Sequence, residues 1–146
     1  MKKYILDANI IFSALISGKQ LFVQLFETNL FYTPDFVFVE IEKYKNTILK
    51  KSKLEKSDFQ FFVTKLFQML TVIPSLYIND KSKLIAVDLC NDIDLKDVVY
   101  VALSVEMQIP LVTRDIPLYE GLKRKGFENV ILLDDLIKNE LTNIHK

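Results

Sequence analysis

Two aspartates three residues apart, Asp94 and Asp97, stand where a strongly apolar segment of the chain begins. Residues three apart on a helix share a face, so a helix that begins here directs both carboxylates the same way. The partial positive charge at a helix N-terminus favours anions, and an aspartate there also caps free backbone N–H groups. The pair is therefore either a helix cap or part of an acidic site.

Three further acids occupy positions that an α/β fold brings to the same end of a sheet. Asp7 directly follows the apolar run 4–6, and Asp115 comes shortly after the apolar run 110–112. Glu40 lies in the second turn of a predicted helix. Because sites in open parallel sheets form outside the C-terminal ends of the strands, we expect these acids to meet there.

Four or five carboxylates in one pocket repel one another at neutral pH unless some stay protonated or a cation joins them. A hard divalent ion is the simplest solution. Carboxylate and water oxygens suit Mg²⁺ or Mn²⁺, whereas zinc prefers histidine and cysteine, of which the chain has only His145 and Cys90. Such an ion generates a hydroxide nucleophile and neutralises charge on a phosphodiester. The acids thus predict a Mg²⁺ or Mn²⁺ cofactor and hydrolytic chemistry.

Predicted strands and helices alternate along the whole chain. Short apolar runs, typical of parallel strands covered on both faces, occur at 4–6, 31–32, 72–73, 110–112 and 130–133. Amphipathic or apolar segments predict helices at 8–16, 21–27, 34–50, 59–70, 80–91, 98–105, 118–125 and 134–141. This alternation implies one α/β domain over residues 1–146, a three-layer α/β/α sandwich with a mainly parallel central sheet.

Two local predictions concern how particular helices are placed. Thr33 and Pro34 predict a helix start, with Thr33 as N-cap and Pro34 in the first helical position. In the helix 80–91, the apolar residues expected to face inward are Leu84, Val87 and Leu89.

Composition limits the location and the partners of the chain. Nineteen basic and nineteen acidic residues leave no global basicity, so nucleic-acid binding requires a local patch such as the lysines from Lys43 to Lys56 or the cluster 123–125. Cys90, the single cysteine, is expected in the core and suits a reducing cytoplasm. Asp7 interrupts the apolar N-terminal stretch, and no run is long enough for a membrane span. We therefore expect a cytoplasmic protein.

The ordered set of motifs resembles the PIN-domain family. The motifs run from Tyr4 to Asn9 (YILDAN), through Glu40 in its helix, to Asp94-Leu95-Lys96-Asp97 and Leu111-Val112-Thr113-Arg114-Asp115. They span nearly the whole chain in the right order. The resemblance implies a PIN-like fold and a metal-dependent ribonuclease, often the toxin of a bacterial or archaeal toxin-antitoxin pair.

The resemblance also assigns site residues by position. The family's acidic quartet corresponds to Asp7, Glu40, Asp97 and Asp115, with Asp94 as an auxiliary acid, and polar positions beside it correspond to Asn9 and Thr113. Candidate contacts to RNA are Lys43 and Arg114. Two alternatives stay open: Asp92 in place of Asp94, and Glu42 in place of Glu40, although two residues along a helix turn Glu42 about 200° away.

Two other functions compete with the ribonuclease. A phosphatase resembling the haloacid dehalogenases would use Asp7 as nucleophile, but Asn9 stands where that class needs an acid to protonate the leaving group. A PIN-like binding module without activity is the second.

The apolar residues in the early helices and the stripe on 59–70 predict association, because large exposed apolar patches usually mark interfaces. The residues concerned are Phe12, Leu21, Phe22, Leu25, Phe26, Phe59, Phe62, Val63, Leu66, Phe67 and Leu70. The resemblance implies a homodimer and an antitoxin that places an arginine in the acidic pocket.

Overall fold

The structure, a computed structural model, describes residues 1–144 and contains one five-stranded sheet in the order β3-β2-β1-β4-β5. All four strand pairings are parallel. The strands are β1 Lys3–Leu6, β2 Leu30–Pro34, β3 Leu70–Ile73, β4 Leu111–Thr113 and β5 Val130–Leu132. The predicted α/β class with a parallel sheet is confirmed. His145 lies outside the described residues.

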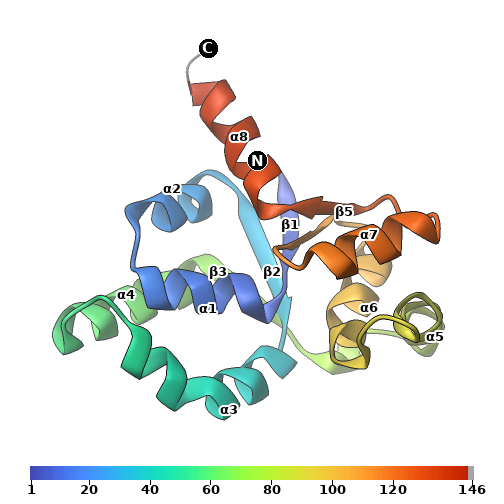
Figure 1. Cartoon of the computed structure of the whole chain (residues 1–146), viewed down its shortest axis with the longest axis horizontal. Helices are drawn as coiled ribbons and strands as arrows, with labels where there is room; N and C mark the ends of the chain where they lie inside the picture. The colour runs from blue at the N-terminus through green and yellow to red at the C-terminus, as the bar shows by residue number, and fades with distance from the viewer. Residues whose placement is uncertain (145–146) are drawn as a thin grey trace.

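Helices cover both sides of this sheet. They are α1 Ala8–Ser17, α2 Gln20–Thr28, α3 Phe36–Lys51, α4 Lys56–Met69, α5 Asp80–Cys90, α6 Val98–Met107, α7 Ile116–Arg124 and α8 Leu133–Ile144, with 3₁₀ turns η1 Ser75–Tyr77 and η2 Leu95–Asp97. Figure 1 shows α1, α2 and α4 to the left of the central strands, α3 below them, and α5 to α7 to their right. α6 contacts β1, β2 and β4, and α5 packs on α6. The arrangement is the predicted three-layer sandwich.

The core lies between the central strands and the helices on either side. Ile5 and Leu111 on the adjacent strands β1 and β4 are fully buried, as are Val101 and Leu103 of α6. An α-helix that is apolar nearly all round is stable in water only when it is covered. The position of α6 against three strands meets that need, and it brings the N-terminal end of α6 to the C-terminal ends of β1 and β4.

Thr33 does not cap a helix, so that prediction is wrong. β2 continues through Pro34, and α3 begins at Phe36 after Asp35, whose side chain makes no capping bond. The buried Thr33 hydroxyl instead donates a hydrogen bond of 3.0 Å to the carbonyl of Leu6 on β1. This bond to the central strand satisfies the buried hydroxyl of Thr33. Helix-capping preferences depend on neighbouring residues only, so they do not predict a bond between two strands.

The inward face of α5 also differs from the prediction. Leu84 and Val87 are 66% and 41% exposed, whereas Leu89 is partly buried and packs on the core. The buried residues share a four-residue spacing and are small: Ser82, Ala86 and Cys90. A stripe of small side chains lets α5 lie close to α6, and it places Cys90 in the core as predicted.

The apolar stripes of α2 and α4 are covered within the monomer. Phe22, Leu25 and Phe26 of α2 and Phe62 and Leu66 of α4 are buried, so the expectation that these faces stay open for association is wrong. Four partly buried residues of the same set pack against this core: Phe12, Phe59, Val63 and Phe67. Leu21 is partly buried and lines a surface depression.

The large apolar side chains that do reach solvent on α3 and α4 are different ones, among them Phe38 and Phe61, at 51% and 71% exposed. Within residues 1–144 no helix has the length and apolar character that crossing a membrane requires.

Candidate active site

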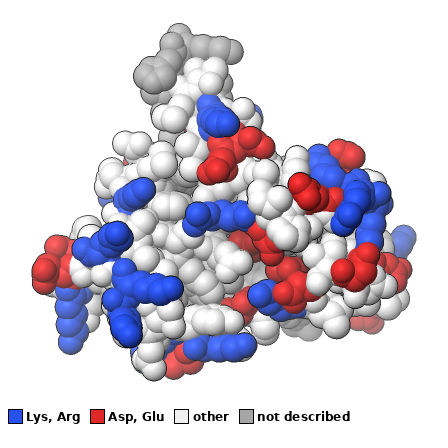
Figure 2. All heavy atoms as spheres, in the orientation of Figure 1, with Lys and Arg blue, Asp and Glu red and all other residues white. Residues whose placement is uncertain are grey.

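A hollow of about 250 Å³ opens beside the C-terminal end of β1. Its wall includes four of the predicted site residues and their neighbours from α1, α3, η2 and α6: Asp7, Asn9, Glu40, Tyr44, Thr47, Lys96, Asp97 and Tyr100. In Figure 2, which has the orientation of Figure 1, acidic side chains gather near the centre of the visible face, with basic side chains to their left. The hollow therefore has an acidic lining and a partly basic surrounding.

Asp7 is held rigidly at the N-terminus of α1. One carboxylate oxygen accepts a hydrogen bond of 3.2 Å from the backbone N–H of Ile10, and the other accepts one of 2.6 Å from the Thr113 hydroxyl. The pKa of Asp7 is raised to about 6. Burial is the largest cause and the charges of Asp115 and Glu40 add to it, while the two hydrogen bonds lower the pKa. A cation nearby would return this carboxyl to its ionised form.

Asp97 carries a buried oxygen without a partner. The residue is only 6% exposed, and its Oδ2 has no hydrogen-bond donor in the described part of the chain. Burial, then repulsion from Asp7, Asp94 and Asp115, raises its pKa to about 7. Unpaired buried polar atoms are rare in folded proteins and require an explanation, of which a bound ion is one.

Asp94 and Asp97 do not share a helix face as predicted, because α6 begins only at Val98. Asp94 has extended backbone and caps the turn η2, accepting 3.1 Å from the backbone N–H of Lys96, whose ammonium lies 3.4 Å from its other oxygen. The capping interpretation is therefore correct for Asp94. Asp97 makes no capping bond, and its side chain lines the hollow.

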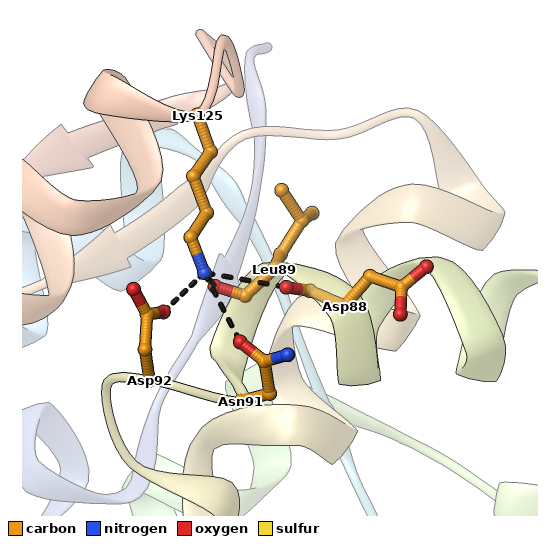
Figure 3. Close-up of polar contacts among 5 residues, drawn as sticks. All are labelled: Asp88, Leu89, Asn91, Asp92 and Lys125. Carbon is orange, nitrogen blue, oxygen red and sulfur yellow. Dashed lines mark hydrogen bonds and ion pairs between the residues drawn. The ribbon is translucent and has the colours of Figure 1, made fainter.

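Asp92 and Glu42, the two open alternatives, both lie outside the wall of the hollow. Asp92 is ion-paired with Lys125 and does not line the hollow (Figure 3). Glu42 is exposed, and its nearest cation is the ammonium of Lys45 at 4.0 Å. Asp94 also lies outside the wall, but its charge raises the pKa of Asp97. Glu40 lines the hollow, whereas Glu42 does not.

Glu40 is positioned by a tyrosine that sequence reasoning missed. The hydroxyl of Tyr100 donates a hydrogen bond of 2.5 Å to the Glu40 carboxylate. Tyr100 is buried, and burial together with this bond raises its pKa far above the ordinary range, so it remains a donor at any physiological pH. The only feature of the sequence that could have indicated this role is the position of Tyr100 three residues after Asp97. Glu40, its hydrogen-bond partner, is 60 residues away in the sequence.

Thr113 links two acids of the site. Its hydroxyl donates to Asp7 and accepts a 3.1 Å hydrogen bond from the backbone N–H of Asp115. Asp115 itself caps α7, accepting 3.0 Å from the backbone N–H of Leu118. Asp115 is partly buried and lies outside the wall of the hollow, but its charge raises the pKa of both Asp7 and Asp97.

The predicted basic contacts lie around the hollow. Arg114 donates a 2.5 Å hydrogen bond to the hydroxyl of Ser13 and faces a neighbouring depression that Lys19 also lines. Lys43 is exposed, with its ammonium 5.3 Å from the ring centre of Tyr44. The lysine in the wall itself is Lys96, which the sequence prediction did not select.

The oxygen atoms of these side chains are the ligands that a hard divalent cation prefers. The polar wall offers carboxylate oxygens and the amide of Asn9, and Asp97 has an oxygen free to bind. Within residues 1–144, no three His, Cys, Asp or Glu side chains form a ready-made ion site, so binding requires the carboxylates to draw closer.

Comparisons with solved structures show the same fold in other proteins. One is a chain of VapBC2 from Rickettsia felis, solved bound to a DNA fragment from its promoter, with 21% identity and a TM-score of 0.55 over 89% of this chain and 96% of that chain. Another belongs to a toxin-antitoxin complex from Klebsiella pneumoniae, with 18% identity and a TM-score of 0.58 over 88% of this chain and 95% of that chain. No curated protein matched the sequence.

The sequence profile of the PIN domain matches residues 5–134. This span runs from β1 into the first turn of α8 and includes every acid of the site. The chain therefore belongs to the PIN-domain family.

Proposed function

We propose that this protein is a Mg²⁺- or Mn²⁺-dependent ribonuclease with Asp7, Glu40, Asp97 and Asp115 as its catalytic acids and Asp94 as an auxiliary one. The observation that carries the proposal is the buried, unpartnered Oδ2 of Asp97 beside a second buried carboxylate with a raised pKa. Two such groups destabilise the metal-free protein, and perturbed carboxyl groups concentrate at functional sites.

The residues of the chain prepare the site for this chemistry. Thr113 fixes the orientation of Asp7, and Tyr100 fixes that of Glu40, so neither carboxylate needs to be ordered when the substrate arrives. A bound divalent ion supplies an activated water and neutralises charge on the phosphodiester. Asn9 and Lys96 in the wall are placed to contact the sugar-phosphate backbone.

RNA binding relies on local charge, because the chain as a whole is neutral. Lys96 lies in the wall of the hollow, and Arg114 and Lys19 line the depression next to it. These three cations, with Lys43 on α3, give a phosphate backbone favourable contacts on either side of the acids.

The proposed biological role is that of a cytoplasmic toxin controlled by an antitoxin. It is supported by the shared fold of the two solved structures named above, VapBC2 bound to its promoter DNA and a toxin-antitoxin complex. The exposed apolar side chains of α3 and α4, such as Phe38 and Phe61, offer a surface for the antitoxin or for a second copy in a homodimer.

Membership of the PIN-domain family sets aside the haloacid-dehalogenase-like phosphatase. An inactive binding module is separated from a ribonuclease by assay. Labelled single-stranded RNA is incubated with the protein and Mn²⁺, Mg²⁺ or EDTA, beside a phosphatase assay on p-nitrophenyl phosphate. We expect RNA cleavage with either ion, none in EDTA, none by Asp97→Asn, and no phosphatase activity. Persistent cleavage by purified Asp97→Asn, or no cleavage by the parent, contradicts the proposal.

A further inference from the structure

The C-terminus of α5 is capped by a residue from another helix. Helices usually end on a glycine or asparagine in left-handed conformation, but Asn91 after α5 stays right-handed. Two of the last carbonyls of α5, those of Asp88 and Leu89, instead accept hydrogen bonds of 3.3 and 3.0 Å from the ammonium of Lys125 (Figure 3). A cation is favoured here because the end of a helix carries partial negative charge.

The same ammonium also binds the loop that follows α5. It donates 3.4 Å to the side-chain carbonyl of Asn91 and pairs with the carboxylate of Asp92, which holds the pKa of Asp92 below its ordinary value. Figure 3 shows the lysine reaching down from the end of α7 into the ring of acceptors around this turn. An isolated surface ion pair contributes little, whereas a cation with four acceptors on one turn fixes the path of that turn.

A second contact joins this loop to α7 one turn earlier. Gly121 is buried, and a Cβ placed on it would lie 2.6 Å from Cδ1 and 3.0 Å from Cγ1 of Ile93. The side chain of Ile93 therefore occupies the space that any larger residue at position 121 would take. Segment 91–93 is held against α7 by one polar and one apolar contact.

α7 thereby connects two parts of the acidic site. Its N-cap is Asp115, and its other end holds the segment that leads, through η2, to Asp97. We propose that Lys125 and Gly121 are positioning residues, which anchor segment 91–97 on α7 and so set the place of Asp97 relative to Asp115. The anchoring is a property of the fold, and its consequence for metal binding rests on the proposed function.

The first test compares Lys125→Met with Lys123→Met. Lys123 also lies near the end of α7, but its ammonium bonds to Glu128 in its own segment, at 2.9 Å, so it is a control for the loss of a charge. In metal-free protein, hydrogen exchange is measured at the amides of Ile93 and Asp97, which donate to Cys90 and Asp94 at 3.0 and 3.1 Å. We expect about tenfold faster exchange in Lys125→Met and no change in Lys123→Met. Equal exchange in both variants overturns the anchoring.

The second test uses the contact of Gly121 with Ile93. Gly121→Ala favours the helix itself but displaces Ile93, so we expect Mn²⁺ affinity to fall about tenfold, as for other residues that support metal ligands, without loss of stability. Adding Ile93→Val removes the Cδ1 atom that lies 2.6 Å from the new Cβ and should restore the affinity. A Gly121→Ala protein that binds Mn²⁺ like the parent, or one that Ile93→Val does not rescue, refutes the positioning role.

The two readouts separate this inference from the proposed function. A parent protein that binds no Mn²⁺ contradicts the proposed function, and hydrogen exchange still decides whether Lys125 anchors the segment. Faster exchange in Lys125→Met with unchanged Mn²⁺ affinity overturns the positioning role alone. Because Gly121→Ala tests the same segment through a different contact, a poorly folded Lys125→Met protein does not leave the question open.

Discussion

Replacing Asp97 with asparagine should stabilise the metal-free protein at alkaline pH. The carboxylate is nearly fully buried, one of its oxygens has no hydrogen-bond partner within the described residues, and the charges of Asp7, Asp94 and Asp115 oppose its ionisation. Asparagine keeps the shape, removes the charge and brings N–H donors to a group of carboxylates. The change therefore removes repulsion without leaving a cavity.

The size of the effect follows from the pKa. Burial and repulsion raise the pKa of Asp97 from 3.8 to about 7 on folding. At about 1.36 kcal/mol per unit the full shift costs about 4 kcal/mol, and solvent screening in the open hollow reduces the expected gain to about 2 kcal/mol. Well below pH 3.8 the carboxyl is protonated in both the folded and the unfolded state, and the cost is absent. Between about pH 4 and pH 7 the carboxyl is ionised in the unfolded chain but protonated in the folded protein, so the cost to folding grows as the pH rises. Above about pH 7 both states are ionised and the cost is constant.

Urea unfolding in EDTA at pH 4 and pH 8 measures this directly. The free energy of unfolding of Asp97→Asn should exceed that of the parent by about 2 kcal/mol at pH 8 and by no more than about 0.6 kcal/mol at pH 4, where the unfolded carboxyl is only partly ionised. The comparison is Asp94→Asn, which keeps a capping side chain at a partly exposed site. It removes one charge that repels Asp97 but also the ion pair with Lys96, and because these effects oppose each other, stability should change by less than about 0.5 kcal/mol. Equal stability of Asp97→Asn and the parent at pH 8, or a destabilised variant, refutes the reasoning.

Three further predictions concern residues around the acids. Tyr100→Phe removes the donor to Glu40 and should lower Mn²⁺ affinity about tenfold in calorimetric titrations while costing no more than about 1.5 kcal/mol of stability. Thr113→Val removes the 2.6 Å bond that lowers the pKa of Asp7, so the acidic limb of the pH–activity profile should move to higher pH, and an unmoved limb contradicts that role. Cys90 should not react with Ellman's reagent at pH 8 until the protein is unfolded, because burial raises the pKa of its thiol to about 11.

The sheet was predictable because each strand contains a short apolar run, and β1 and β4 are each followed closely by an acid of the site. Asp7 and Asp115 were placed this way, since a residue shortly after a buried parallel strand must lie at the C-terminal end of the sheet. Glu40 and Asp97, which the sequence pattern placed on two different helices, line one hollow, although Asp97 precedes α6 and does not lie in it.

Other features depend on contacts between distant parts of the chain. Tyr100 meets Glu40 across 60 residues, and Lys125 meets Asp92 across 33, so no local pattern indicates either pair. Local reasoning also failed at Thr33, whose hydroxyl is satisfied by β1 rather than by a helix. It failed for the face of α5 because close packing on α6 selects small residues over Leu84 and Val87.

The central claim is that the acidic hollow binds a divalent ion through ionised carboxylates, and titration calorimetry with Mn²⁺ tests it most directly. The titration is carried out at pH 6 in two buffers of different ionisation enthalpy, with the parent and Asp97→Asn. The pKa values of about 6 for Asp7 and about 7 for Asp97 predict saturable binding accompanied by proton release, because these carboxyls must ionise to hold the ion. Asp97→Asn should bind far more weakly. No saturable binding by the parent, or equal binding by both proteins, contradicts the account.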